Sequence, residues 1–157
     1  MDLLTFCKAT ADVLRLDILC VLRAESYGVM ELCRIFDTNQ PNVSHHLKIL
    51  ARAELLQTRR EGNSIFYRRA IISLHDPLAD LKRHLFTAVD QMPISPEIES
   101  RCRSVHLERA QHSREFFSKN ADRLKENQDL IAELSSYAAS IEDLLNNETW
   151  RDKTQVV

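Results

Sequence analysis

Residues 39–48 carry the densest group of hydrogen-bonding side chains in the sequence. These polar residues are Asn39, Gln40, Asn42, Ser44, His45, His46 and Lys48. Apolar residues recur among them at helical spacing, as Val43, Leu47 and Leu50. The pattern predicts a helix with a buried stripe and a polar outer face. Such a helix fits the B-DNA major groove, which is about 12 Å wide, and amide side chains near its N-terminus can pair with adenine.

A basic segment overlaps this helix and continues beyond it. In residues 39–70 only Glu54 and Glu61 oppose the basic residues, which are Lys48, Arg52, Arg59, Arg60, Arg68 and Arg69. The chain as a whole has a formal net charge of −2, so the positive charge is local. Phosphate contact requires a local basic face whatever the total charge. We expect Lys48, Arg52, Arg59 and Arg60 to neutralise phosphates; a solvated strand face is the alternative for the two neighbouring arginines.

The elements that position these residues can be predicted from periodicity and turn signals. With 2 Gly and 4 Pro in 157 residues, a mostly helical fold is favoured. Two short strand-like runs flank Glu61-Gly62-Asn63 and predict a hairpin, whose tip at Asn63 can reach a neighbouring minor groove. Helices are expected over residues 2–11, 13–23, 29–36, 41–53 and 76–92, and strands over residues 55–60 and 64–69. The predicted fold class is mainly α with a small β-hairpin wing.

Three regions are expected along the chain. Residues 1–92 should form a winged helix-turn-helix domain that binds DNA and dimerises, residues 93–96 a linker, and residues 97–157 a helical C-terminal extension. Readers of this kind place paired helices on two half-sites, which predicts a two-fold dimer. The dimer seam is expected at apolar positions of the first and fifth helices, namely Leu3, Leu4, Cys7, Leu81, Leu85 and Val89.

Several motifs together resemble the ArsR/SmtB-type repressors over residues 3–92. The motifs are Phe6 with Thr10–Asp12, Arg15, Leu16, Ile18 and Leu19; Gln40–Leu50; Glu54–Leu56; Arg59–Asn63; and Phe66–Tyr67. The resemblance implies a homodimeric, non-enzymatic repressor that binds double-stranded operator DNA and is released by a small effector. The absence of a signal peptide or an apolar span in these residues leads us to expect a cytoplasmic protein with no membrane partner.

Metal sensing is tested by the ligand patterns that the resemblance implies. The arsenic and cadmium type has a Cys-x-Cys pair in the third helix, whereas here Cys33 is followed by Arg34 and Ile35. The zinc type has an Asp-x-His pair in the fifth helix, and here Asp80 is followed at that spacing by Lys82. We therefore expect no metal or cofactor. A metal or redox sensor using Cys33, Cys102 or His106 stays open as an alternative.

The C-terminal residues resemble a different element. Residues 107–145, followed by Lys153–Val157, are similar to the helical lead-in of a fused S-adenosylmethionine-dependent methyltransferase domain. The glycine-rich loop of such a domain is missing from these residues, so no methyltransferase site is expected here. A fragment of a fusion protein, a dimerisation arm and an effector pocket remain alternatives. Candidate effectors are S-adenosylhomocysteine and S-adenosylmethionine.

Overall fold

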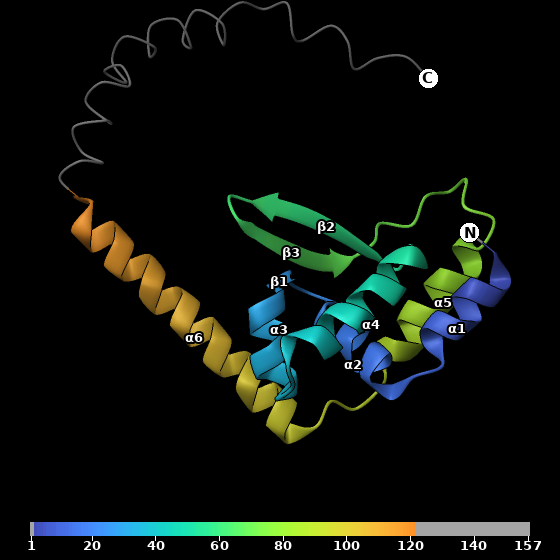
Figure 1. Cartoon of the computed structure of the whole chain (residues 1–157), viewed down its shortest axis with the longest axis horizontal. Helices are drawn as coiled ribbons and strands as arrows, with labels where there is room; N and C mark the ends of the chain where they lie inside the picture. The colour runs from blue at the N-terminus through green and yellow to red at the C-terminus, as the bar shows by residue number, and fades with distance from the viewer. Residues whose placement is uncertain (1, 122–157) are drawn as a thin grey trace, which may run out of the picture. The chain divides into compact units, whose positions relative to one another are not determined.

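The computed structural model describes residues 2–121 and confirms a mainly helical fold with a small sheet (Figure 1). In chain order the elements are α1 (Leu3–Thr10), α2 (Val13–Val21), β1 (Tyr27–Gly28), α3 (Val29–Phe36), α4 (Gln40–Arg52), β2 (Leu56–Glu61), β3 (Ser64–Arg69), α5 (Ala79–Asp90) and α6 (Pro96–Lys119). The short strand β1 is an addition to the predicted elements. It pairs with β3, giving an antiparallel sheet of order β1-β3-β2.

Side-chain caps set where the N-terminal helices and α4 begin. The carboxylates of Asp2 and Asp12 accept hydrogen bonds from the backbone N–H of Thr5 and Arg15, at 2.8 and 3.0 Å. In the same way the amide oxygen of Asn39 accepts from the N–H of Asn42 at 3.0 Å. Each cap satisfies a helix-end donor that has no intrahelical partner. These local bonds explain why helix starts could be anticipated from sequence.

The core lies between α2, α3, α4 and the base of the hairpin. Each of these three helices contributes side chains with no exposed surface, for example Ile18 of α2, Leu32 of α3 and Leu47 of α4. Val89 of α5 is also buried, at 1% exposure within a single chain. Val89 was expected at the dimer seam, and that placement is wrong because its side chain is already covered by its own chain. Leu3 and Leu4 of α1, by contrast, are exposed.

The hairpin register decides which face each wing side chain occupies. Thr58 lies opposite Tyr67 and Arg60 opposite Ile65, so these four residues share one face. Arg59 therefore points to the other face from its neighbour. Gly62 in the turn has φ +57°, the left-handed conformation that glycine adopts without strain.

The first compact unit comprises residues 1–108, and the second comprises residues 109–157. Within the first unit, the start of α6 packs on the core through Ile98, Cys102 and the buried Val105. The predicted linker at 93–96 lies in the connection between α5 and α6 and includes the first residue of α6. Over residues 2–121, no helix is long and apolar enough to cross a membrane.

Candidate nucleic-acid interface

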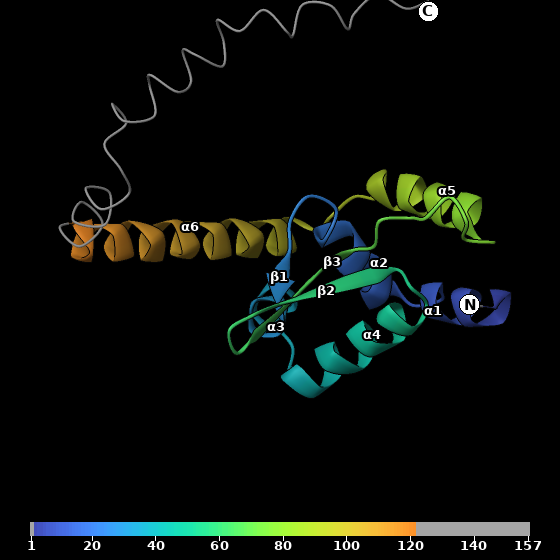
Figure 2. The same ribbon diagram turned by 90° about the horizontal axis from the view of Figure 1, so that it is seen from above.

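Helix α4 presents a polar face to solvent opposite its buried stripe. Val43, Leu47 and Leu50 are fully buried. The exposed residues include Gln40, Asn42, His45, Lys48 and Arg52, and Ser44 is half-buried. Figure 2 shows α4 at one edge of the first unit, on the side away from α5. The buried stripe fixes the rotation of the helix, so most of the predicted polar residues stand together on one accessible surface.

Two of the predicted DNA-contacting amides also organise the start of α4. The side-chain oxygen of Asn39 caps the helix, and the amide nitrogen of Asn42 donates to Thr38 Oγ1 at 3.1 Å. Gln40 is exposed, and its side chain makes no hydrogen bond to any residue in the part of the chain that the structure describes. Gln40 is therefore the amide in the first turn that is most available to a ligand.

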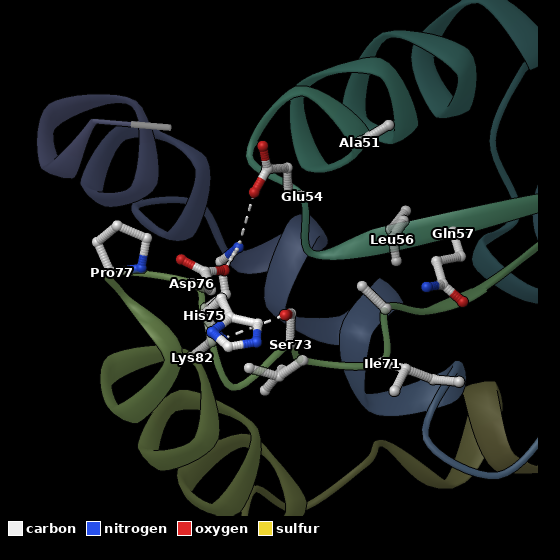
Figure 3. A pocket seen from close by; sticks show the side chains of 12 residues that line it. Ala51, Glu54, Leu56, Gln57, Ile71, Ser73, His75, Asp76, Pro77 and Lys82 are labelled. Carbon is white, nitrogen blue, oxygen red and sulfur yellow. Dashed lines mark hydrogen bonds and ion pairs between the residues drawn. The ribbon is translucent and has the colours of Figure 1, made fainter.

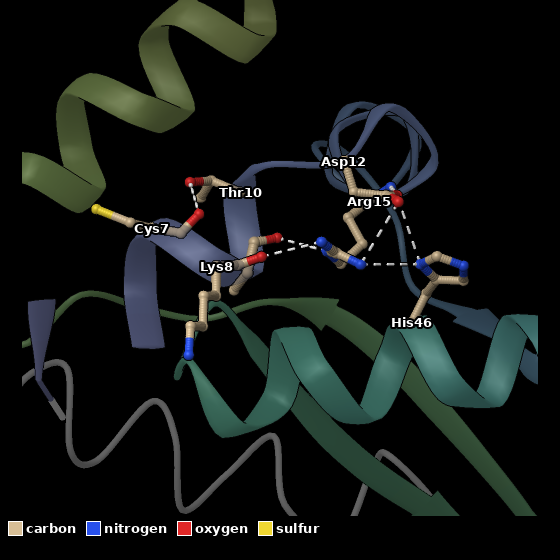
Figure 4. A network of polar contacts seen from close by, with 7 residues as sticks. Cys7, Lys8, Thr10, Asp12, Arg15 and His46 are labelled. Atoms are coloured by element: carbon tan, nitrogen blue, oxygen red, sulfur yellow. Dashed lines mark hydrogen bonds and ion pairs between the residues drawn. The ribbon is translucent and has the colours of Figure 1, made fainter. Parts of the chain in front are cut away.

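His46 does not belong to the exposed face, so its assignment there was wrong. Its side chain is 13% exposed and faces Asp12 and Arg15, with Nδ1 at 3.5 Å from Asp12 Oδ1 and 3.3 Å from Arg15 Nη1 (Figure 4). The same arginine donates to the carbonyls of Ala9 and Lys8, at 2.7 and 2.9 Å. The network joins the end of α1 and the start of α2 to the middle of α4. His46 thus holds the helix in place, whereas its neighbour His45 is exposed.

Burial lowers the pKa of His46 from its ordinary value of 6.5, with Asp12 opposing the shift and Arg15 adding to it. Below about pH 6.5 the unfolded chain therefore takes up a proton more readily than the folded chain. The stabilisation by neutral His46 is complete above that pH and is lost as pH falls.

We expect wild-type protein to lose stability relative to His46→Gln between pH 7.5 and pH 5.5, measured by urea unfolding at each pH. Titration of the other carboxyl and imidazole groups is common to both proteins and cancels in the difference. The control is His45→Gln, at the exposed neighbouring histidine. A constant difference between wild type and His46→Gln across this pH range would contradict the prediction.

The wing arginines are divided between solvent and interior. Arg59 forms an ion pair with Glu61 at 2.5 Å, and Arg60 donates from Nε to the Gly62 carbonyl at 3.1 Å; both are exposed, as is Asn63. Arg69, counted in the basic segment, turns inward instead. It donates to the Leu19 carbonyl at 2.6 Å and pairs with Asp90 at 2.8 Å. Arg69 therefore anchors the wing to α2 and α5.

A cleft of about 350 Å³ lies between α4 and the wing. It is lined by the N-terminal end of α3, by Gln40 at the start of α4, and by Asn63–Phe66 of the hairpin. Gln40 and Asn63 therefore border the same cleft, although more than twenty positions separate them in the sequence. The structure brings the predicted reader and the predicted wing tip together on one side of the molecule.

The alternative sensor residues Cys33, Cys102 and His106 differ in burial and in their partners. Cys33 is buried and Cys102 is half-buried, and burial raises the pKa of both thiols. A thiol with a raised pKa is a weak nucleophile and a weak metal ligand at neutral pH. His106 Nε2 lies 2.6 Å from the buried Tyr27 hydroxyl and 2.9 Å from Glu25 Oε2. Among residues 2–121, no group of three His, Cys, Asp or Glu side chains is arranged to hold a metal ion.

Helices α3 and α4, joined by a short turn and followed by the β2–β3 hairpin, define a winged helix-turn-helix protein. Residues 12–58 match the family described as bacterial regulatory protein, arsR family. The arsenical resistance operon repressor of Staphylococcus aureus is 35% identical over 80 residues, which cover 51% of this chain and 77% of that protein. The chain therefore belongs to the arsR family of bacterial regulatory proteins.

Other relatives extend the comparison. The transcriptional repressor SdpR of Bacillus subtilis is 32% identical over 71 residues, covering 45% of this chain and 79% of SdpR. Among solved structures, the homodimeric winged helix-turn-helix DNA-binding domain of a possible ArsR-family regulator from Mycobacterium bovis is 28% identical. The match covers 55% of this chain and 72% of the Mycobacterium bovis chain, with a TM-score of 0.46.

Proposed function

We propose that this protein is a cytoplasmic repressor that binds double-stranded operator DNA through α4 and the wing. The observation that carries the proposal is the exposed face of α4, which carries Gln40, His45 and Lys48 and whose first residue borders the same cleft as the basic hairpin. Gln40 and Asn42 would contact base edges from the first turn, with Ser44 and His45 one turn further along. Lys48, Arg52, Arg59 and Arg60 would contact phosphates. Asn63 would approach the adjacent minor groove, while Asn39 acts mainly as the helix cap.

The same proposal requires two copies of the chain. Leu3 and Leu4 of α1 are 55% and 63% exposed, and Leu81 of α5 is 40% exposed. Figures 1 and 2 both place α1 and α5 at the same end of the first unit. Exposed leucines at one end of a protein indicate an interaction surface. We infer that this end forms the two-fold seam, with Cys7 and the half-buried Leu85 at its margins.

Release by a small effector is part of the proposal. The resemblance of the C-terminal residues to a methyltransferase lead-in makes S-adenosylhomocysteine and S-adenosylmethionine the first effectors to test. Of the residues that carry this resemblance, 122–145 and Lys153–Val157 lie outside the described residues. A metal or redox switch is the weaker candidate because Cys20 and Cys33 are buried and Cys102 is half-buried, and this burial raises the pKa of all three thiols.

The test is selection from a randomised duplex library with the full chain at fixed salt, followed by sedimentation of the selected complex. We expect a sequence with two symmetric half-sites about one helical turn apart, bound by two chains. Equal binding to all duplexes, or a single chain on the selected site, would overturn the proposal of a dimeric sequence reader.

Replacing Arg60 with alanine should weaken binding to every duplex and reduce the salt dependence of binding. Each phosphate contact releases counterions and contributes roughly 0.9 to the slope of log K against log salt concentration. We expect the slope to fall by about one unit, measured by fluorescence anisotropy between 50 and 200 mM salt. The matched control is Arg103→Ala, which removes a 64%-exposed arginine side chain from α6. If only the specific site lost affinity, Arg60 would be reading bases rather than phosphates.

A further inference from the structure

A second hollow of about 530 Å³ lies where the end of α4, the base of β2 and the start of α5 meet (Figure 3). The segment 70–77, which connects the wing to α5, lines the hollow as well. Ala51, Leu56 and Ile71 supply aliphatic surface, and Glu54, Asp76 and Lys82 supply a charged centre. The pocket therefore places an aliphatic surface next to charged and polar side chains, a combination that small-molecule sites use to orient a ligand.

The charged centre is built around a buried ammonium group. Lys82 is 2% exposed, and its Nζ contacts Asp76 Oδ2 at 2.5 Å and Glu54 Oε2 at 3.2 Å. A buried charge is expensive unless it is paired and hydrogen-bonded, so Lys82 needs carboxylate partners to remain in this position. From the sequence alone, Lys82 is notable only because it stands where the zinc-binding type of repressor has a histidine ligand.

The two carboxylates differ in how firmly they are held. The Asp76 side chain is 13% exposed and also accepts a hydrogen bond from the Leu78 N–H at 2.9 Å. The hydrogen bond from Lys82 holds the pKa of Asp76 below its usual range, so this partner stays ionised. Glu54 has the longer contact with Lys82, and its side chain is 59% exposed. Glu54 can therefore move into solvent at much lower cost than Asp76.

We propose that this pocket binds a small aliphatic carboxylate, which takes the place of Glu54 beside Lys82. The exchange puts one carboxylate in place of another, so the charge around the ammonium group is unchanged. The hydrocarbon part of the ligand would contact the surface formed by Ala51, Leu56 and Ile71 and would leave water. The binding site is defined by the pocket and Lys82 alone. Only the effect of the ligand on DNA binding rests on the proposed repressor function.

The consequence follows from where Glu54 lies. It comes two residues after the end of α4, whereas Lys82 belongs to α5 at the proposed dimer seam. The Lys82–Glu54 ion pair thus links the end of the reading helix to a seam helix. A carboxylate that replaces Glu54 would break this link in each subunit. Ligand binding and DNA binding would then be coupled, and each would weaken the other by the same factor.

The direct test is calorimetric titration of the full chain with sodium hexanoate, 1-hexanol and hexylammonium chloride. We expect hexanoate to bind and the uncharged and cationic probes of equal chain length to bind at least tenfold more weakly. Preferred binding of hexylammonium, or no discrimination among the three probes, would overturn the proposed ligand class. Failure of hexanoate to bind would overturn the site.

Two variants locate the binding. Glu54→Gln weakens the competing partner of Lys82 at an exposed position, so hexanoate affinity should rise about tenfold, the effect expected from losing one charge-assisted hydrogen bond. Lys82→Met should abolish hexanoate binding where the circular dichroism spectrum shows a folded protein. The control for Glu54→Gln is Asp80→Asn, which also replaces a carboxylate by an amide, on an 86%-exposed side chain of α5. Its hexanoate affinity should equal that of wild type. Equal affinity in Glu54→Gln and wild type would contradict the exchange.

The link to DNA is measured separately on the selected operator. Hexanoate at saturating concentration should lower operator affinity of wild type and leave Lys82→Met unaffected. If the protein binds its operator but ignores hexanoate, the inference fails and the repressor function stands. If hexanoate binds in the pocket but no operator can be selected, the repressor function fails and the site stands.

Discussion

Replacing Leu47 with alanine should destabilise the folded protein by about 2–5 kcal/mol, as measured by urea unfolding. Leu47 lies in the middle of α4 and has no exposed surface, so the truncated side chain leaves a cavity among fully buried neighbours. Part of the cost is lost transfer of apolar atoms from water, and part is the cavity itself. Such a loss is a large fraction of the stability of a small domain.

The matched control for Leu47 is the same substitution at Leu74, whose side chain is 85% exposed. Leu74→Ala should change the free energy of unfolding by less than about 0.5 kcal/mol, because no cavity is created. Similar losses in the two variants would show that Leu47 is not in the core, and the assigned rotation of α4 would then be wrong.

Replacing Gln40 with alanine should lower affinity for the selected operator by roughly ten- to a hundredfold. A bidentate contact between an amide and adenine is worth about 1–3 kcal/mol of discrimination. Preference should relax at one base pair in each half-site, and the melting temperature should barely change because the side chain is exposed. The measurement pairs a thermal melt with binding to the randomised duplex library.

Gln91→Ala provides the control for Gln40, since Gln91 is an exposed glutamine that caps the C-terminal end of α5 and belongs neither to α4 nor to the wing. It should keep both the affinity and the sequence preference of wild type. If Gln40→Ala retained the wild-type preference, α4 would not read bases through its first turn. The proposed function would then lose the residue on which its specificity depends.

Much of the interface could be predicted from sequence because it depends on local patterns. Helical spacing of Val43, Leu47 and Leu50 gave the buried stripe, and most of the polar residues between them are exposed as expected. Capping by Asn39 and the turn at Gly62 are likewise encoded within a few residues of where they act. Helical spacing does not predict whether His46 is buried or exposed, because this residue lies at the margin of the buried stripe.

The sequence by itself determined the order of the helices, the hairpin and the face of α4, because periodicity, caps and turn residues act over short stretches of chain. Only the tertiary structure decided which ionisable side chains turn inward. His46 meets Arg15 from α2, Arg69 meets Asp90 of α5, and Lys82 meets Glu54 beyond α4. Each pairing joins residues more than twenty positions apart, and it forms because a charged or polar group enclosed by packing must find a partner there.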